Sequence, residues 1–291
     1  MKASADCGPC LMKRILFQSR IAGTGREFEA VKQCMGRYSE LMVEGVCSAA
    51  IATDVHALCY RIMDNDDPYL QMKIDADRIA EQYLPLAQRF IDSSEDRLHA
   101  AVRVSLIGNI MDFGSGIAID SPDEFGRMFD SLLNQGIESD EFDMLEQLIS
   151  SSSVILYAFD NCGESQFDKL LIREIKALGK RVVGVVRGAP ILNDVTMEDA
   201  LRIGLDRELD RIVSTGEFAI GFPEHVGDPG FQEELASAGL LITKGMANYE
   251  SLSDYDMPVP VVFLLRAKCA PVAASLNVPV GTNVVRVKRV E

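Results

Sequence analysis

The sequence predicts an α/β fold in which a helical N-terminal half packs on a C-terminal, Rossmann-like sheet of mostly parallel strands with flanking helices. Two observations predict it. Apolar residues recur at helical spacing over residues 1–150, and short apolar runs alternate with helical segments over residues 151–291. Such alternation is typical of βαβ units, whose strands are covered on both faces. We therefore expect a mainly helical region over 1–150 and an α/β region over 151–291.

The first region is expected to consist of amphipathic helices separated by turns. Apolar stripes run over 38–46, 58–74, 84–91, 98–110 and 129–132. Pro68 follows two aspartates and marks a helix start. The run Ser93-Ser94-Glu95-Asp96 predicts the N-cap of the helix that follows it, and 84–91 is expected to be a helix of its own. Ser121-Pro122 opens a further helix.

The second region reads as strands joined by helices. Apolar runs predict strands over 154–159, 181–186, 211–214, 239–243 and 259–265, and 284–287 adds a last strand for which an antiparallel direction is considered. Between the first two runs, Phe167, Leu171 and Ile175 keep helical spacing. This is a strand-helix-strand unit.

Composition excludes several classes of protein. The chain has 291 residues, enough for one large domain or two smaller ones, and a net charge of −15. A nucleic-acid binder normally carries a basic face, so we expect neither a nucleic-acid partner nor a membrane partner. No signal peptide or membrane-spanning run is recognised, which predicts a cytoplasmic protein whose seven cysteines are mostly reduced. The oligomeric state is not indicated.

Asp160 and Asn161 directly follow the first predicted strand, and Glu164 lies three residues further on. Ligand crevices of open α/β sheets lie at the carboxyl ends of strands. Two oxygen ligands on a sharp turn there suit a hard divalent cation. Turn and helix-cap chemistry is the competing interpretation.

Two further segments place polar groups near the same edge. Asn109 and Asp112 lie three apart at the end of a predicted helix, either as a C-cap and turn or facing the ligand crevice. Asp194 follows the second strand and a connecting segment. It is either the N-cap of the next helix or a carboxylate within reach of the ion held by Asp160, because neighbouring strands lie about 4.8 Å apart.

Three cations follow later strands. Lys244 stands at a strand end before Gly245 and a helix start, and Arg266 and Lys268 end another strand on one face. On an acidic protein, cations at strand ends indicate an anion site. The alternative is a set of surface charges that neutralise nearby carboxylates.

Cys7-Gly8-Pro9-Cys10 has the spacing of a redox or zinc half-motif. No strand precedes it and no second such pair exists, so we expect Cys7 and Cys10 to be structural thiols at a helix start. A local disulfide and a metal half-site stay open.

Taken together, these motifs resemble the metal-dependent damage-control phosphatases, the ARMT-like domain family, and its short archaeal and bacterial subfamily with an N-terminal CxxC. The resemblance rests on the CxxC, GNxxD at 108–112, DNxGE at 160–164, DVT at 194–196, KGxxNYE at 244–250 and RxK at 266–268.

The resemblance implies a divalent metal, Mn²⁺, Ni²⁺, Co²⁺ or Mg²⁺, bound by Asp160, Asn161 and Asp194. It also implies substrate contacts from Glu164, Asn248, Tyr249 and Lys268. The pattern departs from the eukaryotic branch at Arg266-Ala267-Lys268, where one residue instead of two separates the cations, and at Glu250, where a sugar-phosphate enzyme carries Arg.

The predicted function is hydrolysis of phosphate monoesters of small metabolites, sugar phosphates or damaged metabolites among them. Asp160, Asn161 and Asp194 would hold the metal, and Asn109, Asp112, Lys244, Arg266 and Lys268 would help to bind the substrate. Attack by Asp160 and attack by water are both open. The alternatives are a carboxyl methyltransferase, a non-catalytic phosphometabolite-binding protein and a thiol oxidoreductase at Cys7 and Cys10.

Overall fold

The computed structural model describes all of the chain except residues 110–128, 130, 133–135, 138, 224 and 291. Its described strands form one sheet in the order β1-β7-β6-β5-β2-β3-β4. They are β1 (Ser139–Asp140), β2 (Val154–Ala158), β3 (Arg181–Val186), β4 (Arg211–Ser214), β5 (Leu240–Lys244), β6 (Val261–Arg266) and β7 (Asn283–Lys288). Only the β6–β7 pairing is antiparallel among them. The α/β prediction and its strands are confirmed, and β7 settles the direction of the last one.

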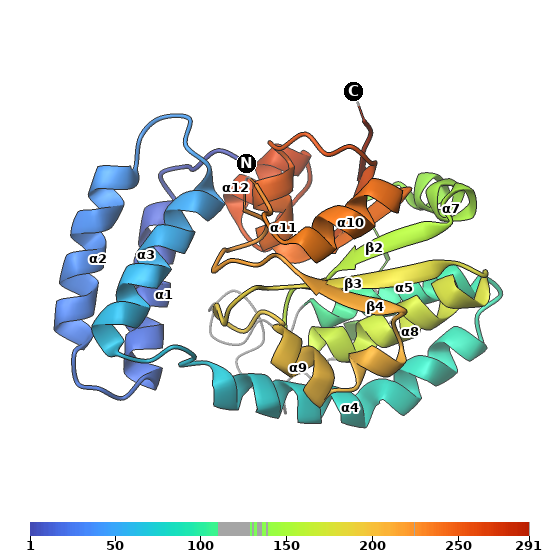
Figure 1. Ribbon diagram of the computed structural model, residues 1–291, viewed down its shortest axis with the longest axis horizontal. Helices are drawn as coiled ribbons and strands as arrows, with labels where there is room; N and C mark the ends of the chain where they lie inside the picture. The colour runs from blue at the N-terminus through green and yellow to red at the C-terminus, as the bar shows by residue number, and fades with distance from the viewer. Residues whose placement is uncertain (110–128, 130, 133–135, 138, 224, 291) are drawn as a thin grey trace.

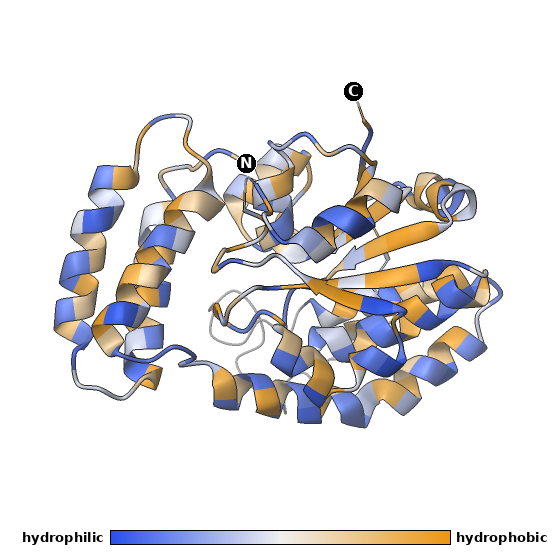
Figure 2. Ribbon diagram, in the orientation of Figure 1, coloured by the Kyte–Doolittle hydropathy of each residue, from blue (hydrophilic) through white to orange (hydrophobic). Residues whose placement is uncertain are grey.

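Helices cover both faces of the sheet, because successive residues of each strand point to opposite sides. On β2, Ile155 and Tyr157 face the layer of α4 (Leu70–Asp92), α5 (Arg97–Gly108), α7 (Phe142–Ser151) and α8 (Glu164–Ala177), whereas Leu156 and Ala158 face the other side. That side is covered by α10 (Pro229–Ser237), α11 (Gly245–Leu252) and α12 (Ala270–Leu276). Figure 2 shows the central strands as predominantly hydrophobic and the outer helices as mixed.

Three N-terminal helices form a separate small bundle at one end of the molecule (Figure 1). They are α1 (Cys7–Ile21), α2 (Glu27–Leu41) and α3 (Ser48–Met63), and they bury a core of their own around Ile15, Cys34, Val55 and Cys59. The bundle faces the edge of the sheet at which β2 and β5 end. Two short elements, α9 (Met197–Arg202) and the 3₁₀ turn Leu205–Arg207, follow β3.

The predicted helix boundaries are mostly confirmed. Asp96 is the N-cap of α5, since its Oδ1 accepts a hydrogen bond from His99 N at 2.9 Å. The separate helix predicted over 84–91 is wrong, because α4 runs without interruption from Leu70 to Asp92 with Pro85 inside it. The long apolar stripe of α4 against α8 explains why one proline does not end it. The helix predicted at Ser121 and the side chain of Asp112 lie outside the described residues.

None of the helices within the described residues is long and apolar enough to span a bilayer.

Candidate active site

The candidate site lies where the strand order reverses, at the carboxyl ends of β2 and β5. The chain leaves β2 toward β3 on one side, and β5 pairs with β2 on the other. Such a switch point opens a crevice in an α/β sheet. Asp160 and Asn161 follow β2, Asp194 lies on the segment after β3, and Lys244 ends β5.

Backbone hydrogen bonds join the two acidic segments directly. Val195 N donates to Asp160 O at 2.8 Å, and Cys162 N donates to Asn193 O at 2.8 Å. Asn161 and Asp194 form an isolated antiparallel bridge. Asp194 is not the N-cap of α9, a role filled by Thr196 in a capping box with Asp199. The interpretation of Asp194 as a mere helix cap is therefore wrong, and its carboxylate is left at the sheet edge beside Asp160.

Asp160 is a buried carboxylate, 6% exposed. Its Oδ2 accepts hydrogen bonds from Asn161 Nδ2 at 2.7 Å and from Asn109 Nδ2 at 3.4 Å. Burial, followed by the charges of Asp194 and Glu164, raises the pKa of Asp160 well above its ordinary value. Three carboxylates thus crowd a buried site, an arrangement that a bound cation would relieve.

Gly245, the first residue of α11, makes room for that carboxylate. A Cβ at Gly245 would lie 1.8 Å from Asp160 Oδ2, and the residue has a φ of +75°. Only glycine adopts this conformation without strain and also avoids the carboxylate. The glycine of the KGxxNYE motif is thus explained by its contact with Asp160.

Arg187 is a buried cation between the two aspartates that sequence reasoning missed. Its Nε donates to Asp194 Oδ2 at 2.6 Å, and its Nη2 lies 3.5 Å from Asp160 Oδ1. Nη1 donates to the side-chain oxygen of Asn248 at 2.8 Å. The available signal was its position directly after the second strand, which matches that of Asp160 after the first.

A second charged cluster lies beneath the aspartates. Lys244 Nζ donates to Glu164 Oε1 and, at 2.8 Å, to Asp168 Oδ1, and all three side chains are fully buried. Asn109 Nδ2 donates to Glu164 Oε2 at 2.9 Å. Burial raises the pKa of Asp168 to about 6, although the charge of Lys244 opposes this shift. For Lys244, burial acts to lower the pKa, but the charges of Asp168 and Glu164 outweigh it, so the pKa of Lys244 is raised.

The structure divides the predicted substrate residues into those at the pocket and those elsewhere. Among the described residues of that set, only Lys268 lines the pocket. Asn248 is buried and donates to Phe159 O and Lys244 O. Tyr249 lies one residue on, about a quarter of a helical turn away, and packs edge-on to Phe263 in the core.

Tyr249 hydrogen-bonds Ser275 on α12, and Arg266 Nη1 donates to Asn283 Oδ1 at 3.1 Å. Arg266 N also donates to Asn109 Oδ1 at 3.2 Å, and Lys244 and Glu164 lie below the aspartates. Glu250, which follows Tyr249, does reach the pocket and accepts a hydrogen bond from Ser48 Oγ at 2.8 Å.

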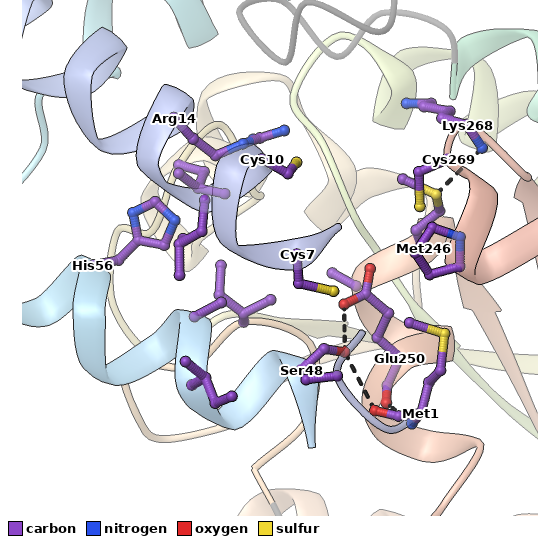
Figure 3. A pocket seen from close by; sticks show the side chains of 18 of the residues that line it. Met1, Cys7, Cys10, Arg14, Ser48, His56, Met246, Glu250, Lys268 and Cys269 are labelled. Atoms are coloured by element: carbon purple, nitrogen blue, oxygen red, sulfur yellow. Dashed lines mark hydrogen bonds between the residues drawn. The ribbon is translucent and has the colours of Figure 1, made fainter. Parts of the chain in front are cut away.

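A pocket with a cavity volume of about 180 Å³ opens between the three-helix bundle and this edge of the sheet. Its floor includes Asp160, Asn161 and Asp194. Figure 3 shows Cys7, Cys10 and Arg14 projecting from α1 on one side, and Met246, Glu250, Lys268 and Cys269 on the other. Leu11, Ile51, Ile220 and other apolar side chains form much of the remaining wall.

Cys7 and Cys10 stand at the start of α1, as predicted; both line the pocket, and no disulfide joins them. Ser4 N donates to Cys7 Sγ at 3.4 Å. Burial raises the pKa of Cys269 to about 11, and the charge of Glu250 acts in the same direction. Lining the pocket was not foreseen, because it depends on where the bundle docks.

The model of the damage-control phosphatase ARMT1-like domain family matches residues 3–284. The chain belongs to this family. A damage-control phosphatase of Archaeoglobus fulgidus is 35% identical over 291 residues, covering 99% of each chain. A damage-control phosphatase of Pyrococcus horikoshii is 30% identical over 256 residues, covering 88% of this chain and 85% of its own length.

A crystal structure shows the same architecture. A DUF89 family protein from Pyrococcus horikoshii superimposes with a TM-score of 0.85 at 27% identity, covering 100% of both chains. The predicted family and the predicted fold are both confirmed. The names of the relatives support phosphatase activity.

The residues at the pocket floor fit a hard divalent cation. Asp160 and Asp194 supply negative charge, and Asn161 supplies an amide oxygen. The described residues hold no cluster of three or more His, Cys, Asp or Glu side chains arranged as metal ligands, so the amide is needed to complete the set. Asn161 Nδ2 now donates to Asp160 and Glu164, and its oxygen would become a ligand when the amide plane turns.

Proposed function

We propose that the protein is a divalent-metal-dependent phosphatase that hydrolyses phosphate monoesters of small metabolites, sugar phosphates or damaged metabolites among them, in the cytoplasm. One observation carries the proposal: Asp160, Asn161 and Asp194 meet at the floor of a pocket whose wall also contains Lys268. The family match and the names of the relatives support the reaction type.

Asp160, Asn161 and Asp194 would hold Mn²⁺, Ni²⁺, Co²⁺ or Mg²⁺. When bound, such an ion supplies a Lewis acid that neutralises charge on the phosphoryl oxygens. Arg187 holds the two aspartates in place from outside the pocket, since its guanidinium contacts both and does not line the cavity. Asn248 fixes Arg187 in turn.

Lys268 is a cation placed to bind a phosphate oxygen. Its side chain lines the pocket with the aspartates, and its charge lowers the pKa of Asp160 against the effect of burial. The protein carries a net charge of −15, so a dianionic ester is repelled at long range and needs such a local cation. The apolar wall around Leu11, Ile51 and Ile220 would receive the organic group of the ester.

The buried pair of Glu164 and Lys244 serves the site indirectly. Glu164 accepts hydrogen bonds from the amides of Asn109 and Asn161, and both amides also donate to Asp160. Lys244 neutralises Glu164 from below. These contacts orient the Asp160 carboxylate, and no substrate contact is needed to explain either residue.

A panel of phosphate esters assayed for free phosphate tests the proposal. We expect hydrolysis with added Mn²⁺, Co²⁺, Ni²⁺ or Mg²⁺ and loss of hydrolysis in excess chelator. Asp160→Ala should lose metal binding while keeping its fold, because it relieves repulsion among buried carboxylates. Asp210→Ala is the matched control, since Asp210 binds Val182 N at the opposite end of β3.

Full activity of the purified protein in chelator, with no metal detected, would contradict metal dependence. Tight binding of esters without release of phosphate would favour a non-catalytic phosphometabolite-binding protein instead.

A further inference from the structure

A network of charged side chains, most of them buried, lies behind the pocket floor and lines no part of the pocket; Asp67 belongs to it through Lys73, whose Nζ lies 2.6 Å from Asp67 Oδ2. It joins Lys73 and Asp77 of α4 to Asp199 and Arg202 of α9. Lys73 Nζ lies 2.8 Å from Asp199 Oδ2, Arg202 Nη1 lies 2.6 Å from Asp199 Oδ1, and Arg202 Nη2 lies 2.8 Å from Asp77 Oδ2. Lys73, Asp77 and Asp199 are at most 4% exposed. Groups buried this deeply without partners would be costly, so the network is a defined structure.

One end of the network holds the turn that carries Asp160. Asp77 Oδ1 accepts a hydrogen bond from the backbone N–H of Gly163 at 2.6 Å. Gly163 has a φ of +81°, and a Cβ there would lie 3.1 Å from the Cβ of Ala76 on the same helix. Helix α4 therefore both shapes the turn and bonds it.

The other end holds the segment that carries Asp194. Asp199 Oδ2 accepts hydrogen bonds from Thr196 Oγ1 at 2.7 Å and Thr196 N at 3.1 Å. Thr196 is two residues from Asp194, and Val195 N is bonded to Asp160 O. The same charge network thus anchors both segments on which the predicted metal ligands stand.

We propose that Asp77 is a positioning residue for the metal site: through Gly163 and Arg202 it sets where Asp160 and Asn161 stand relative to Asp194. The inference rests on the proposed function for the identity of the bound ion. The effect of Asp77 on the turn that contains Gly163 does not depend on the proposed function. Outer hydrogen-bond partners of metal ligands typically change metal affinity about 10- to 100-fold when removed.

Calorimetric titration of the protein with Mn²⁺ tests this. Asp77→Ala, which removes both contacts, should weaken Mn²⁺ binding about 10- to 100-fold, and Asp77→Asn, which keeps an acceptor for Gly163 N–H, should lie between it and the wild type. At saturating Mn²⁺ the kcat of Asp77→Asn should return to within about three-fold of the wild type, because Asp77 does not touch the substrate.

Glu234→Gln is the matched control. Glu234 is also buried, 3% exposed, and pairs with Arg181 at 2.5 Å and with Arg211 at 2.9 Å. Both arginines begin strands, at the edge opposite the pocket. The control should lose stability comparably but keep Mn²⁺ affinity within about two-fold.

A second readout needs no metal. Hydrogen exchange of the Gly163 amide should be at least about ten-fold faster in Asp77→Asn than in Glu234→Gln, because a charge-assisted bond is weakened. Unchanged exchange, or unchanged Mn²⁺ affinity in a folded Asp77→Ala, would overturn the role of Asp77. Absence of Mn²⁺ binding by the wild type, with faster exchange in Asp77→Asn, would instead overturn the proposed metal and leave the positioning role standing.

Discussion

Replacing Gly245 by alanine tests the geometry of the site through one methyl group. A Cβ at this position would lie 1.8 Å from Asp160 Oδ2 and 2.3 Å from its Cγ. Ordinary contact begins near 3.4 Å, so the carboxylate must give way by well over an ångström. Displacing a reacting or binding group by about 1 Å costs on the order of 100-fold in activity. We therefore expect Gly245→Ala to lower metal affinity and kcat/KM by about 100-fold.

A second glycine separates the clash from backbone strain. Gly245 has a φ of +75° and Gly179 a φ of +77°, but a Cβ at Gly179 meets no atom within 4 Å. Both alanine variants should lose about 1–2 kcal/mol of unfolding free energy from the left-handed backbone. Only Gly245→Ala should also lose metal binding.

Three measurements decide between these outcomes: urea unfolding for stability, calorimetry for Mn²⁺ affinity and phosphate release with titrated Mn²⁺ for kcat/KM. If both variants bind Mn²⁺ and turn over substrate alike, then Asp160 does not hold the ion beside Gly245.

Three further predictions concern the pocket. Lys268→Ala should remove a charge-assisted hydrogen bond of about 1.5–3 kcal/mol and so lower kcat/KM roughly 10- to 100-fold, with little change in metal affinity. Steady-state kinetics at titrated metal would measure both quantities. Unchanged kcat/KM on every ester would place the anion site elsewhere. Cys7→Ser combined with Cys10→Ser should lower the melting temperature but leave turnover per folded molecule within about three-fold; a folded, metal-loaded variant without hydrolysis would instead place both thiols in the catalytic machinery. Burial, aided by the charge of Arg14, lowers the pKa of His56 from 6.5 to about 3. Its folded-state pKa lies below the unfolded value, so the stability that depends on neutral His56 is present above pH 6.5 and is lost as the pH falls toward 3, by about 1.4 kcal/mol per unit. Chemical denaturation of His56→Gln at pH 7 and pH 5 should show a shallower decline than the wild type, and equal slopes would refute the neutral buried histidine.

Much of the fold and part of the site followed from the sequence because both depend on local patterns. The strands are buried on both faces and therefore appear as continuous apolar runs, whereas the helices are buried on one face and show apolar residues at helical spacing. Both patterns can be recognised within a few residues of sequence. Asp160 and Asn161 could be placed at the sheet edge because they directly follow a recognisable strand. The separate helix predicted over 84–91 is wrong because its apolar residues belong to the stripe of α4, which packs on the core from Leu70 to Asp92 despite Pro85.

Tertiary structure alone decided which side chains meet. Tyr249 and Asn248 are neighbours in a matching motif, yet the helical rotation sends one into the core and leaves the other beneath Asp160. From the sequence, Lys244 could be predicted to bind an anionic ligand. In the structure it forms buried ion pairs with Glu164 and Asp168 instead.

The pocket itself, and the reach of Cys7, Arg14 and Lys268 into it, depends on how the three-helix bundle docks against the sheet edge. Asp77 bonds Gly163 across 86 residues of chain. Sequence periodicity determines which face of an element is apolar, whereas contacts between elements far apart in the chain arise only when those faces pack. For this protein, the sequence by itself determined the strands and the acidic turn, and the packing of α1, α4 and α11 around that turn determined the site.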